Sequence, residues 1–475
     1  MWYDALNNKR LWSIFNEISS IPRESGNEEG IREWLLAWAK DHDIKALSDK
    51  TGNVIMYVPA TPGFETLPPI ALQGHMDMVC VKREGSSHDF TKDPIEVMTD
   101  GEKVYAKDTS LGADNGIAIA LALDIFSDKV AKHGPLEGIF TISEETGLNG
   151  AYGIEEELIH SRRLINLDSE EEGVIYNGCA GGIEVDGEMK AKWCDAEGEA
   201  LAIKISGLLG GHSGGEINKG RANAINLFGR VLNRIPSSFQ IASLSGGTRR
   251  NVIPSTLEAT VVVKDRELTK SIIKHVEEEV RNEYRYTDPD IKIEAIDSTA
   301  DKALESALSS KISDLLFTSR YGVYSYSPIM KGVVETSDNL AIVTLSEAEV
   351  KAVWSIRSSI ESAKLNLAYS ISALAERCGF KTVLSGSYPA WEPNPESLFT
   401  KEVAEAYKRI EGKEPVIIAI HAGLECGIIN DKIKGMDSIS IGPNLYDVHS
   451  VNEHVEVKSA ERVAAFVKTM LSEIK

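Results

Sequence analysis

The hydrophobic pattern of this chain predicts a sheet of buried strands whose ends carry polar residues. Four short runs, apolar or rich in β-branched residues, have the length of buried strands, and a residue of metal-binding type follows each one. The runs are residues 69–72, 139–142, 163–167 and 439–441, and the residues that follow them are His75, Glu144, Asp168 and His449. Because open α/β sheets form their sites outside the carboxyl ends of the strands, we expect these distant side chains to meet in one crevice.

Helical periodicity marks three further segments. Ile117, Leu121 and Ile125 recur at helical spacing, so a helix is expected to open at Asp114, a residue suited to a helix amino end. A second helix is expected over residues 396–410. Residues 460–474 predict an amphipathic helix that closes the chain, with an apolar face formed by Val463, Phe466, Val467, Met470 and Ile474.

The candidate residues fall before about residue 180 or after about residue 415, which indicates one α/β domain interrupted by a long insertion. The predicted boundaries are 1–184 and 385–475 for the two parts of that domain and 185–384 for the α+β insert. The insert shows two similar halves, each with strands and a helix. They comprise residues 201–205, 222–235 and 257–263 in the first, and 332–334, 340–345, 352–358 and 362–377 in the second.

Taken in chain order, five polar motifs supply the donors that two adjacent zinc ions require. They are Gly74-His75-Met76-Asp77, Gly112-Ala113-Asp114-Asn115-Gly116, Ser143-Glu144-Glu145-Thr146-Gly147, Leu167-Asp168-Ser169 and Asp447-Val448-His449. Each ion needs a neutral imidazole and a carboxylate, the two ions share one carboxylate, and a spare carboxylate handles protons. Any one of these residues alone is explained as a turn or surface residue, but six in this order have no common structural reason.

These motifs resemble those of the co-catalytic zinc exopeptidases related to carnosinase and glutamate carboxypeptidase. More narrowly, four segments resemble the bacterial aminoacyl-histidine dipeptidases, and the likeness runs essentially from end to end. The segments are Gln73–Val79, Thr109–Gly116, His421–Gly427 and Gly442–Asn444 with Asp447–Ser450. The resemblance implies a mixed-sheet α/β catalytic domain with helices on both faces, interrupted by an α+β lid and dimerisation domain.

The same resemblance implies a ligand set for two zinc ions. His75 and Asp168 would bind one ion, Glu145 and His449 would bind the other, and Asp114 would bridge both. It also implies a cis peptide bond between Asp114 and Asn115.

Asp77 and Glu144 remain without a metal in this scheme. Asp77, two residues beyond His75, is expected to accept the free ring N–H of that ligand and so fix its tautomer. Since consecutive side chains diverge, Glu145 can face a metal while Glu144 faces the water that bridges the ions, acting as general base and then as acid for the leaving amine. The alternative is that Glu144-Glu145 is a solvated charge pair. We interpret Glu170-Glu171-Glu172 as a solvated loop.

A glycine-rich loop in the insert, Gly210–Gly215, surrounds His212. Core packing does not explain it, and the ordinary alternative is a glycine turn with a surface histidine. The resemblance implies a lid loop whose His212 hydrogen-bonds the substrate carbonyl oxygen, often in the partner subunit's site. An imidazole there would stabilise the oxyanion of the tetrahedral intermediate.

Four further residues are candidates for substrate binding. Asn251, which precedes a predicted strand, would donate its amide to the substrate, and Arg357 would bind the free carboxylate of a peptide through a bidentate pair. Ordinary turn chemistry for Asn251 and an exposed strand position for Arg357 remain open. The resemblance places His421 and Gly423 beside the substrate's C-terminal residue, with a strand-to-helix turn as the alternative.

Composition narrows the class of protein. The chain has 51 Lys+Arg against 72 Asp+Glu, and its net charge of −21 repels nucleic acid backbones, so no nucleic acid partner is expected. The beginning of the sequence has no basic segment followed by an apolar core, and the most apolar stretch, residues 117–126, is too short to span a bilayer, so no membrane association is expected. Five cysteines without metal-type spacing favour free thiols in a reducing cytoplasm.

These observations predict a cytoplasmic, homodimeric metallodipeptidase that hydrolyses Xaa-His and other unblocked dipeptides, β-alanyl-histidine included. Two divalent ions per subunit are expected, with zinc first and cobalt or manganese as alternatives. A related tripeptidase or N-acyl-amino-acid deacylase would share the metal core. A catalytically silent peptide-binding or metal-binding protein is the alternative from another class, but a binder has no use for an unligated Glu144.

Overall fold

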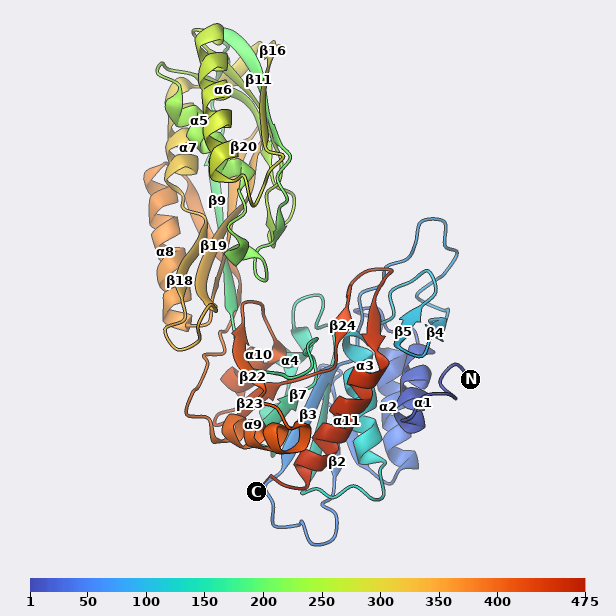
Figure 1. Cartoon of the computed structure of the whole chain (residues 1–475). Coiled ribbons are helices and arrows are strands. Elements are labelled where there is room, and N and C mark those ends of the chain that lie inside the picture. Colours follow the sequence, from blue (N-terminus) through green and yellow to red (C-terminus); the bar gives the residue numbers. More distant parts are fainter. Residues whose placement is uncertain (475) are drawn as a thin grey trace. The chain divides into compact units, whose positions relative to one another are not determined.

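The computed structural model describes residues 1–474, which divide into two compact units. Unit 1 comprises Met1–Gly178, Pro393–Ala419 and Leu424–Lys475, the blue, cyan and red parts of Figure 1. Unit 2 comprises Cys179–Glu392, green to orange, together with the short stretch Ile420–Gly423. The mixed α/β architecture that the sequence predicts is confirmed.

Unit 1 is built around one eight-stranded sheet. Its order is β1 (Lys45–Ser48), β2 (Val54–Val58), β6 (Leu136–Thr141), β3 (Ile70–His75), β7 (Arg163–Asn166), β23 (Asp437–Ser440), β8 (Val174–Cys179) and β22 (Val416–Ile420). β3 is parallel to both of its neighbours, β6 and β7, and β23 is parallel to β7. The four strands expected from the apolar runs are therefore present, and their carboxyl ends share one edge of the sheet.

Helices cover the sheet of unit 1 (Figure 1). They are α1 (Lys9–Ser19), α2 (Glu29–Asp41), α3 (Ala113–Phe126), α4 (Asn149–Gly153), α9 (Leu398–Glu411), α10 (Glu425–Lys432) and α11 (Val457–Leu471). The predicted helices at 396–410 and 460–474 are confirmed as α9 and α11. A small four-stranded sheet adds β24 (Leu445–Tyr446), β25 (His454–Glu456), β5 (Lys103–Ala106) and β4 (Val97–Thr99).

Helix α3 runs through the interior of unit 1 and is buried on all sides from Ile117 to Phe126. It packs against β3, where Gly74 permits the close approach: a Cβ at that position would lie 2.4 Å from Oδ1 of Asn115. The expected helix at Asp114 is present, although Asp114 and Asn115 themselves lack helical dihedral angles. The peptide bond between them is cis, as the family resemblance implied.

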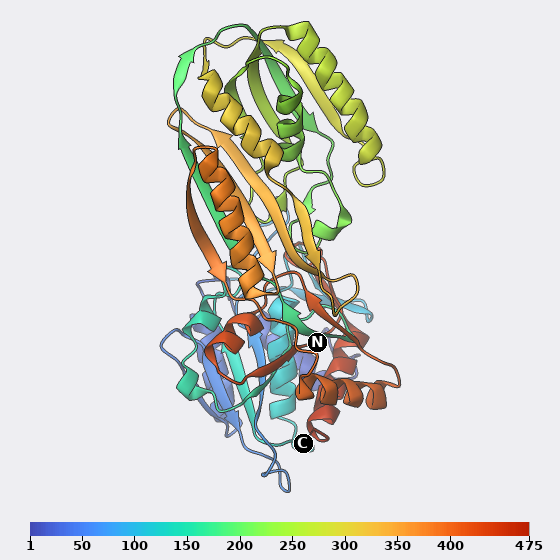
Figure 2. The same ribbon diagram turned by 90° about the vertical axis from the view of Figure 1, so that its left-hand side faces the viewer.

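Unit 2 is a nine-stranded antiparallel sheet. Its order is β16 (Lys292–Ser298), β11 (Glu199–Ser206), β15 (Leu257–Val263), β13 (Gln240–Gly246), β19 (Val334–Leu345), β20 (Glu349–Ser358), β9 (Gly181–Lys190) and β21 (Lys381–Tyr388), with β18 (Gly322–Tyr326) also paired to β19. The helices α5 (Ala224–Arg234), α6 (Arg266–Glu283), α7 (Ser306–Thr318) and α8 (Glu361–Arg377) lie along one face (Figure 2). A single apolar core joins that face to the helices.

One predicted break in unit 2 is wrong. Val334, the last residue of the strand expected at 332–334, and all of the strand expected at 340–345 belong to one long strand, β19, while residues 332 and 333 lie before it. Two side chains of the polar stretch between the two expected strands find partners: Thr336 Oγ1 lies 2.9 Å from Ser358 Oγ, and Ser337 Oγ lies 2.7 Å from Nε2 of His421. Asp338 is buried as well, and neither of its carboxylate oxygens has a hydrogen-bond partner among the described residues. Both predicted halves of the insert contribute strands to this sheet, and their common origin by duplication stays a prediction.

Two features bear on the class of protein. Within residues 1–474, every helix is too short or too polar to cross a membrane. None of the five cysteines forms a disulfide in that part of the chain.

Candidate active site

The candidate metal ligands all lie in unit 1, at the sheet edge formed by the strand ends. His75 is the last residue of β3, Asp114 is the second residue of α3, and Asp168 follows β7 by two residues. Glu145 lies in the loop after β6, and His449 lies between β24 and β25. The structure therefore brings together residues that are up to 374 positions apart in sequence (449 − 75).

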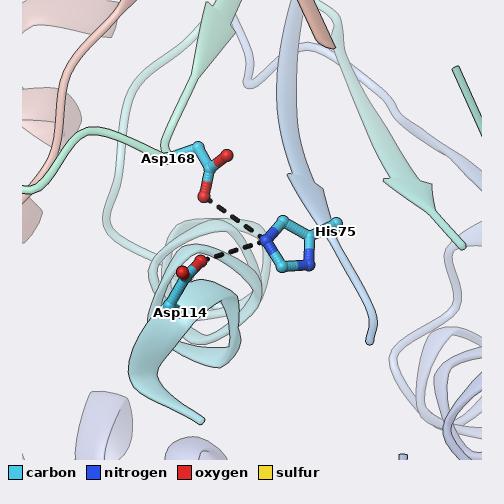
Figure 3. A group of neighbouring side chains, drawn as sticks. All are labelled: His75, Asp114 and Asp168. Carbon is cyan, nitrogen blue, oxygen red and sulfur yellow. Dashed lines mark hydrogen bonds and ion pairs between the residues drawn. The ribbon is translucent and has the colours of Figure 1, made fainter. Parts of the chain in front are cut away.

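His75, Asp114 and Asp168 form a first group (Figure 3). Nε2 of His75 lies 3.0 Å from Oδ1 of Asp114 and 3.6 Å from Oδ1 of Asp168. One possible ligand atom from each residue lies within 4.8 Å of the others. An ion between them would find one imidazole nitrogen and two carboxylates.

Asp114, Glu145 and His449 form a second group. Nε2 of His449 lies 2.9 Å from Oε1 of Glu145 and 3.1 Å from Oδ2 of Asp114. Asp114 thus offers one oxygen to each group, which is the arrangement of a bridging carboxylate. This geometry agrees with the predicted bridging role, and the ligand roles themselves stay predictions.

The chemistry of these donors fits bound cations. Nδ1 of His75 lies 3.1 Å from the carbonyl oxygen of Asp77, so this nitrogen carries the ring proton and Nε2 presents a lone pair to the carboxylates of Asp114 and Asp168. Lone pair and carboxylates repel one another unless a positive charge lies between them. Divalent ions of the zinc type supply that charge and accept imidazole and carboxylate donors.

The electrostatics of both histidines show the same demand for positive charge. Burial would lower the pKa of His75, but the carboxylates of Asp168, Asp114 and Asp77 raise it well above its ordinary value. Hydrogen bonds to Asp114 and Glu145 raise the pKa of His449 to about 11. Without a metal, protons would have to neutralise this cluster.

Asp77 does more than the sequence predicted. Its Oδ1 lies 3.3 Å from Nδ1 of His75, the expected contact with the ligand ring. The two carboxylate oxygens also accept the backbone N–H groups of Glu144, at 3.0 Å, and Glu145, at 3.2 Å. Burial opposes ionisation, yet His75, Ser25 and the Glu144 N–H lower the pKa of Asp77 to about 2. Asp77 is therefore an ionised anchor for the loop that carries both glutamates.

Glu144 lies where a general base is expected. A side-chain oxygen of Glu144 and ligand atoms of His75 and Glu145 lie within 4.8 Å of one another. Burial raises the pKa of Glu144 to about 8, and the charge of His75 opposes this rise. The alternative of a solvated charge pair does not fit, because Glu144 and Glu145 face the ligand groups.

The acidic triplet that follows Asp168 is only partly as predicted. Glu170 and Glu171 are exposed as whole residues, as expected for a solvated loop. Burial nevertheless raises the pKa of the Glu170 carboxyl to about 7, and the charges of Asp114 and Glu145 add to this rise. The Glu172 carboxylate is instead largely buried and paired with Arg462, whose Nε lies 2.6 Å from Oε1. The partner lies 290 residues away, so local sequence gave no sign of it.

The candidate substrate residues all lie in unit 2. His212 ends the short strand β12 (Gly211–His212), which pairs with β14 (Val252–Ile253), just after Asn251. The backbone carbonyl of Asn251 accepts the N–H of Ser213 at 2.9 Å. Burial, and after it the charge of Arg357, lowers the pKa of both His212 and His421. Burial and Arg357 together bring the pKa of His421 to about 3.

Tyr388, which holds Arg357 in place, was not among the residues predicted from the sequence. Nη1 of Arg357 donates to the Tyr388 hydroxyl at 2.9 Å, while its buried Nε has no hydrogen-bond partner among the described residues. The tyrosine ring lies against Gly182 and Gly423, where a Cβ would approach it to 2.3 Å and 3.0 Å. Tyr388 is the last residue of strand β21, and its neighbours in sequence carry no signal of such a contact.

A second unpredicted residue is Glu425, within the His421–Gly427 motif. It is fully buried at the start of α10. Its Oε2 accepts hydrogen bonds from Nε2 of Gln73, at 2.6 Å, and from Oγ1 of Thr141, at 2.7 Å. Since Gln73 lies in β3 and Thr141 ends β6, Glu425 joins the two strands that carry His75 and the glutamate loop.

Comparisons with known proteins agree with this geometry. The model of the family described as Peptidase family M20/M25/M40 matches residues 71–473. Over 480 residues the chain is 40% identical to the cytosol non-specific dipeptidase of Escherichia coli (strain K12), covering 99% of this chain and 98% of that protein. The structure of aminoacylhistidine dipeptidase from Vibrio alginolyticus matches with a TM-score of 0.91 and 35% identity, covering 99% of this chain and 98% of that one.

More distant structures share the fold alone. Aminopeptidase PepT from Bacillus cereus ATCC 10987 matches with a TM-score of 0.60 at 17% identity, over 99% of both chains. The resemblance drawn from the sequence motifs is confirmed by the family match and the two dipeptidases.

Proposed function

The chain belongs to peptidase family M20/M25/M40 and is a metal-dependent hydrolase of peptide bonds, and we propose that it acts on Xaa-His and other unblocked dipeptides, β-alanyl-histidine included. The observation that carries the proposal is the division of Asp114 between two groups, each with one histidine and one further carboxylate. Its likeness to two dipeptidases over nearly the whole chain supports the substrate class.

In the proposed mechanism, His75 and Asp168 would hold one divalent ion, Glu145 and His449 would hold the other, and Asp114 would contribute to both sites. When bound, two such ions polarise the scissile carbonyl and lower the pKa of a water molecule. Glu144 takes a proton from the attacking water and then gives it to the leaving nitrogen. Asp77 fixes the loop of Glu144 and Glu145 through their backbone N–H groups, so the base stays beside the ligands.

The residues of unit 2 bind the substrate in this proposal. Arg357 presents Nε and Nη2 as a fork to the free carboxylate of the dipeptide, since Nη1 is already bonded to Tyr388. His212 hydrogen-bonds the substrate carbonyl oxygen, and Asn251 donates its amide. His421 and Gly423 line the place of the C-terminal residue, where a neutral His421 can accept or donate without adding charge.

An activity panel tests the substrate class. Hydrolysis of L-carnosine, Leu-His and Ala-Ala by the zinc-loaded protein, lost on chelation and restored by zinc, is the expected result. Faster cleavage of a tripeptide or of an N-acetyl amino acid would identify the tripeptidase or the deacylase instead. Metal binding without any turnover would identify a silent binding protein.

The general base is tested separately. Glu144→Gln is expected to lower kcat by about 10²–10⁴-fold while metal content stays unchanged. The matched control is Glu157→Gln, which changes an exposed glutamate of the same unit. Unchanged turnover in Glu144→Gln would refute the assigned base.

Metal identity, assembly and location complete the proposal. We propose zinc as the native ion, with cobalt and manganese as ions that also support activity, because imidazole and carboxylate donors accept all three. We also propose a cytoplasmic homodimer; the name of the Escherichia coli relative supports the cytosol. Elemental analysis of the purified protein tests whether zinc is the native ion. Light scattering tests whether the protein is a homodimer.

A further inference from the structure

Two buried opposite charges contact the turn Leu111–Asp114, at the start of α3, and the proposed mechanism uses neither of them. One is the Glu453 carboxylate: Oε2 accepts the N–H groups of Leu111, at 2.7 Å, and Gly112, at 3.0 Å, while Oε1 accepts the N–H of Asp114 at 3.2 Å. The other is Arg23, whose Nη2 donates to the carbonyl oxygen of Gly112. The turn that carries the shared ligand is thus held from both sides.

Arg23 ties this turn to the segment of His75. Its Nη1 donates to the carbonyl oxygens of Met76 and Asp77, each at 3.0 Å. Gly112 has φ of +69°, and a Cβ there would lie 2.5 Å from Nη2 of Arg23, so only glycine leaves room for the guanidinium. Arg23 therefore fixes the first ligand group, His75 with Asp114.

Glu453 ties the same turn to the segment of His449. It lies four residues after His449 and is almost fully buried, with 3% of its surface exposed. Three backbone N–H donors at a helix amino end suit a negative charge. Burial raises the pKa of Glu453, and the N–H groups of Gly112, Asp114 and Leu111 oppose this rise. Burial also lowers the pKa of Arg23, and Glu453 is the strongest of the charges that oppose that change.

The two histidine ligands differ in what else holds them. The His75 side chain is 1% exposed and is fixed by its surroundings at the end of a central strand. The His449 side chain is 47% exposed, and both Asp447 and His449 have positive φ, at +52° and +59°. Residues in that region need support from contacts elsewhere. His449 therefore depends on its loop anchors, and Glu453 is the anchor that reaches the backbone of Asp114.

We propose that Glu453 is a positioning residue that holds His449 against Asp114 before any ion binds, and that it thereby sets the affinity of the ion bound by Glu145 and His449. The inference rests on the proposed ligand assignment. It assigns the two buried charges to different ions: Arg23 supports the site of His75, and Glu453 supports the site of His449.

The variant Glu453→Gln tests this role. Glutamine has the same size but is neutral, and its amide would set an N–H group against a backbone N–H of the turn. Metal-free protein is titrated with Zn²⁺ in competition with a chromophoric chelator, without substrate. The affinity for one ion is expected to fall by about 10–100-fold, and the affinity for the other to stay within about threefold.

Matched variants define which ion is affected. Glu453→Gln should weaken the binding of the same ion as His449→Ala, which lacks a proposed ligand of the second ion. His75→Ala should instead weaken the binding of the first ion. Glu456→Gln is the control: Glu456 lies on the same segment and accepts a hydrogen bond from Nδ2 of Asn444, at 2.9 Å, but makes no hydrogen bond to the turn among the described residues. Both ions should bind that control as tightly as they bind the native protein.

Three outcomes decide the inference. Selective weakening of one ion, shared with His449→Ala, supports it. A lower melting temperature of the metal-free protein with both affinities unchanged would show a merely structural role and overturn it, as would equal weakening of both ions. If Glu453→Gln does not fold, Glu453→Asp, which keeps the charge on a shorter side chain, is measured instead and should weaken the same ion. Since no step needs a substrate, failure of the dipeptidase proposal leaves this test intact.

Discussion

Histidines in the two units have opposite electrostatic surroundings. In unit 1, carboxylates surround His75 and His449 and raise their pKa. In unit 2, burial and the charge of Arg357 lower the pKa of His212 and His421. The same residue type is therefore prepared to share a cation in one unit and to stay a neutral hydrogen-bonding group in the other. Burial and neighbouring charge, rather than residue type, decide which protonation state a histidine adopts.

The difference extends to what each cluster can bind. The cluster of unit 1 is rich in carboxylates and requires positive charge, which divalent ions supply. The cluster of unit 2 contains Arg357, whose buried Nε has no hydrogen-bond partner among the described residues, and two histidines of lowered pKa, so the carboxylate of a peptide is the group that we propose it binds. Substitutions that exchange or remove these charges test the comparison.

The largest expected effect comes from Asp114→Ala. Loss of the carboxylate shared by both groups should remove both tightly bound ions and lower activity by about 10³-fold or more. Elemental analysis after dialysis, together with kcat/KM for Leu-His, measures it. Asp108→Ala is the control, since Asp108 lies close by in sequence but is exposed and paired with Arg83. If Asp114→Ala retained two ions, the carboxylate cluster of unit 1 would not share Asp114 between them, and this half of the comparison would be wrong.

Next in size is Arg357→Met, which removes the positive charge from unit 2. KM for dipeptides should rise by about 10–100-fold, because a charge-assisted pair with the substrate carboxylate is lost, while metal content stays unchanged. Lys351→Met, on the same strand β20, is the matched control because Lys351 pairs with Glu188 and Glu349 at the surface. An equal loss of affinity for a dipeptide amide would argue against a contact with the carboxylate.

His421 gives a smaller effect that depends on pH. Its pKa is about 3 in the folded protein, against 6.5 for an ordinary histidine, so only the unfolded chain takes up a proton between these values. Folding stability is therefore fully present above pH 6.5 and falls as the pH drops toward 3. Between pH 6.5 and 5 the loss is about 2 kcal/mol.

The variant His421→Gln should remove this part of the pH dependence. Its melting temperature should fall less between pH 7 and pH 5 than that of the native protein, as measured by calorimetry. His275→Gln, which changes an exposed histidine of helix α6 in the same unit, should keep the native slope. Identical slopes in all three proteins would show that His421 is not held neutral.

The smallest expected effect is that of Tyr388→Phe. Without the hydroxyl that accepts from Nη1, Arg357 keeps its charge but loses its fixed orientation, so KM should rise by about 3–10-fold. The turnover number should change little, because Tyr388 belongs to the substrate cluster of unit 2. A fall in kcat at constant KM would assign Tyr388 to catalysis rather than to positioning.

The sequence predicted the strands that carry the candidate ligands because strands and their ends have local signals, while the ligand roles stay predictions. Apolar runs marked β3, β6, β7 and β23, and the parallel arrangement placed their polar successors at one edge. The order of motifs then limited the chemistry. Each of these inferences used residues that are close together in sequence.

The anchors of the site could not be predicted in this way. Glu453 and Arg23 bind backbone N–H and carbonyl groups, which nearly every residue possesses. The residue types in the sequence therefore do not show which backbone groups are the partners. Tyr388 and Glu425 also find their partners across many residues. The break wrongly expected within β19 falls on polar residues that lie inside the strand, where Ser337 contacts His421, 84 residues away in sequence.

The order of strands in unit 1 has a consequence for biosynthesis. β23 lies between β7 and β8, although both of these leave the ribosome long before it. Until Asp437–Ser440 emerges, the growing polypeptide exposes unpaired backbone along β7, an edge that invites pairing with other nascent molecules. Translation speed through the final segment therefore governs how long each newly made molecule stays vulnerable to aggregation.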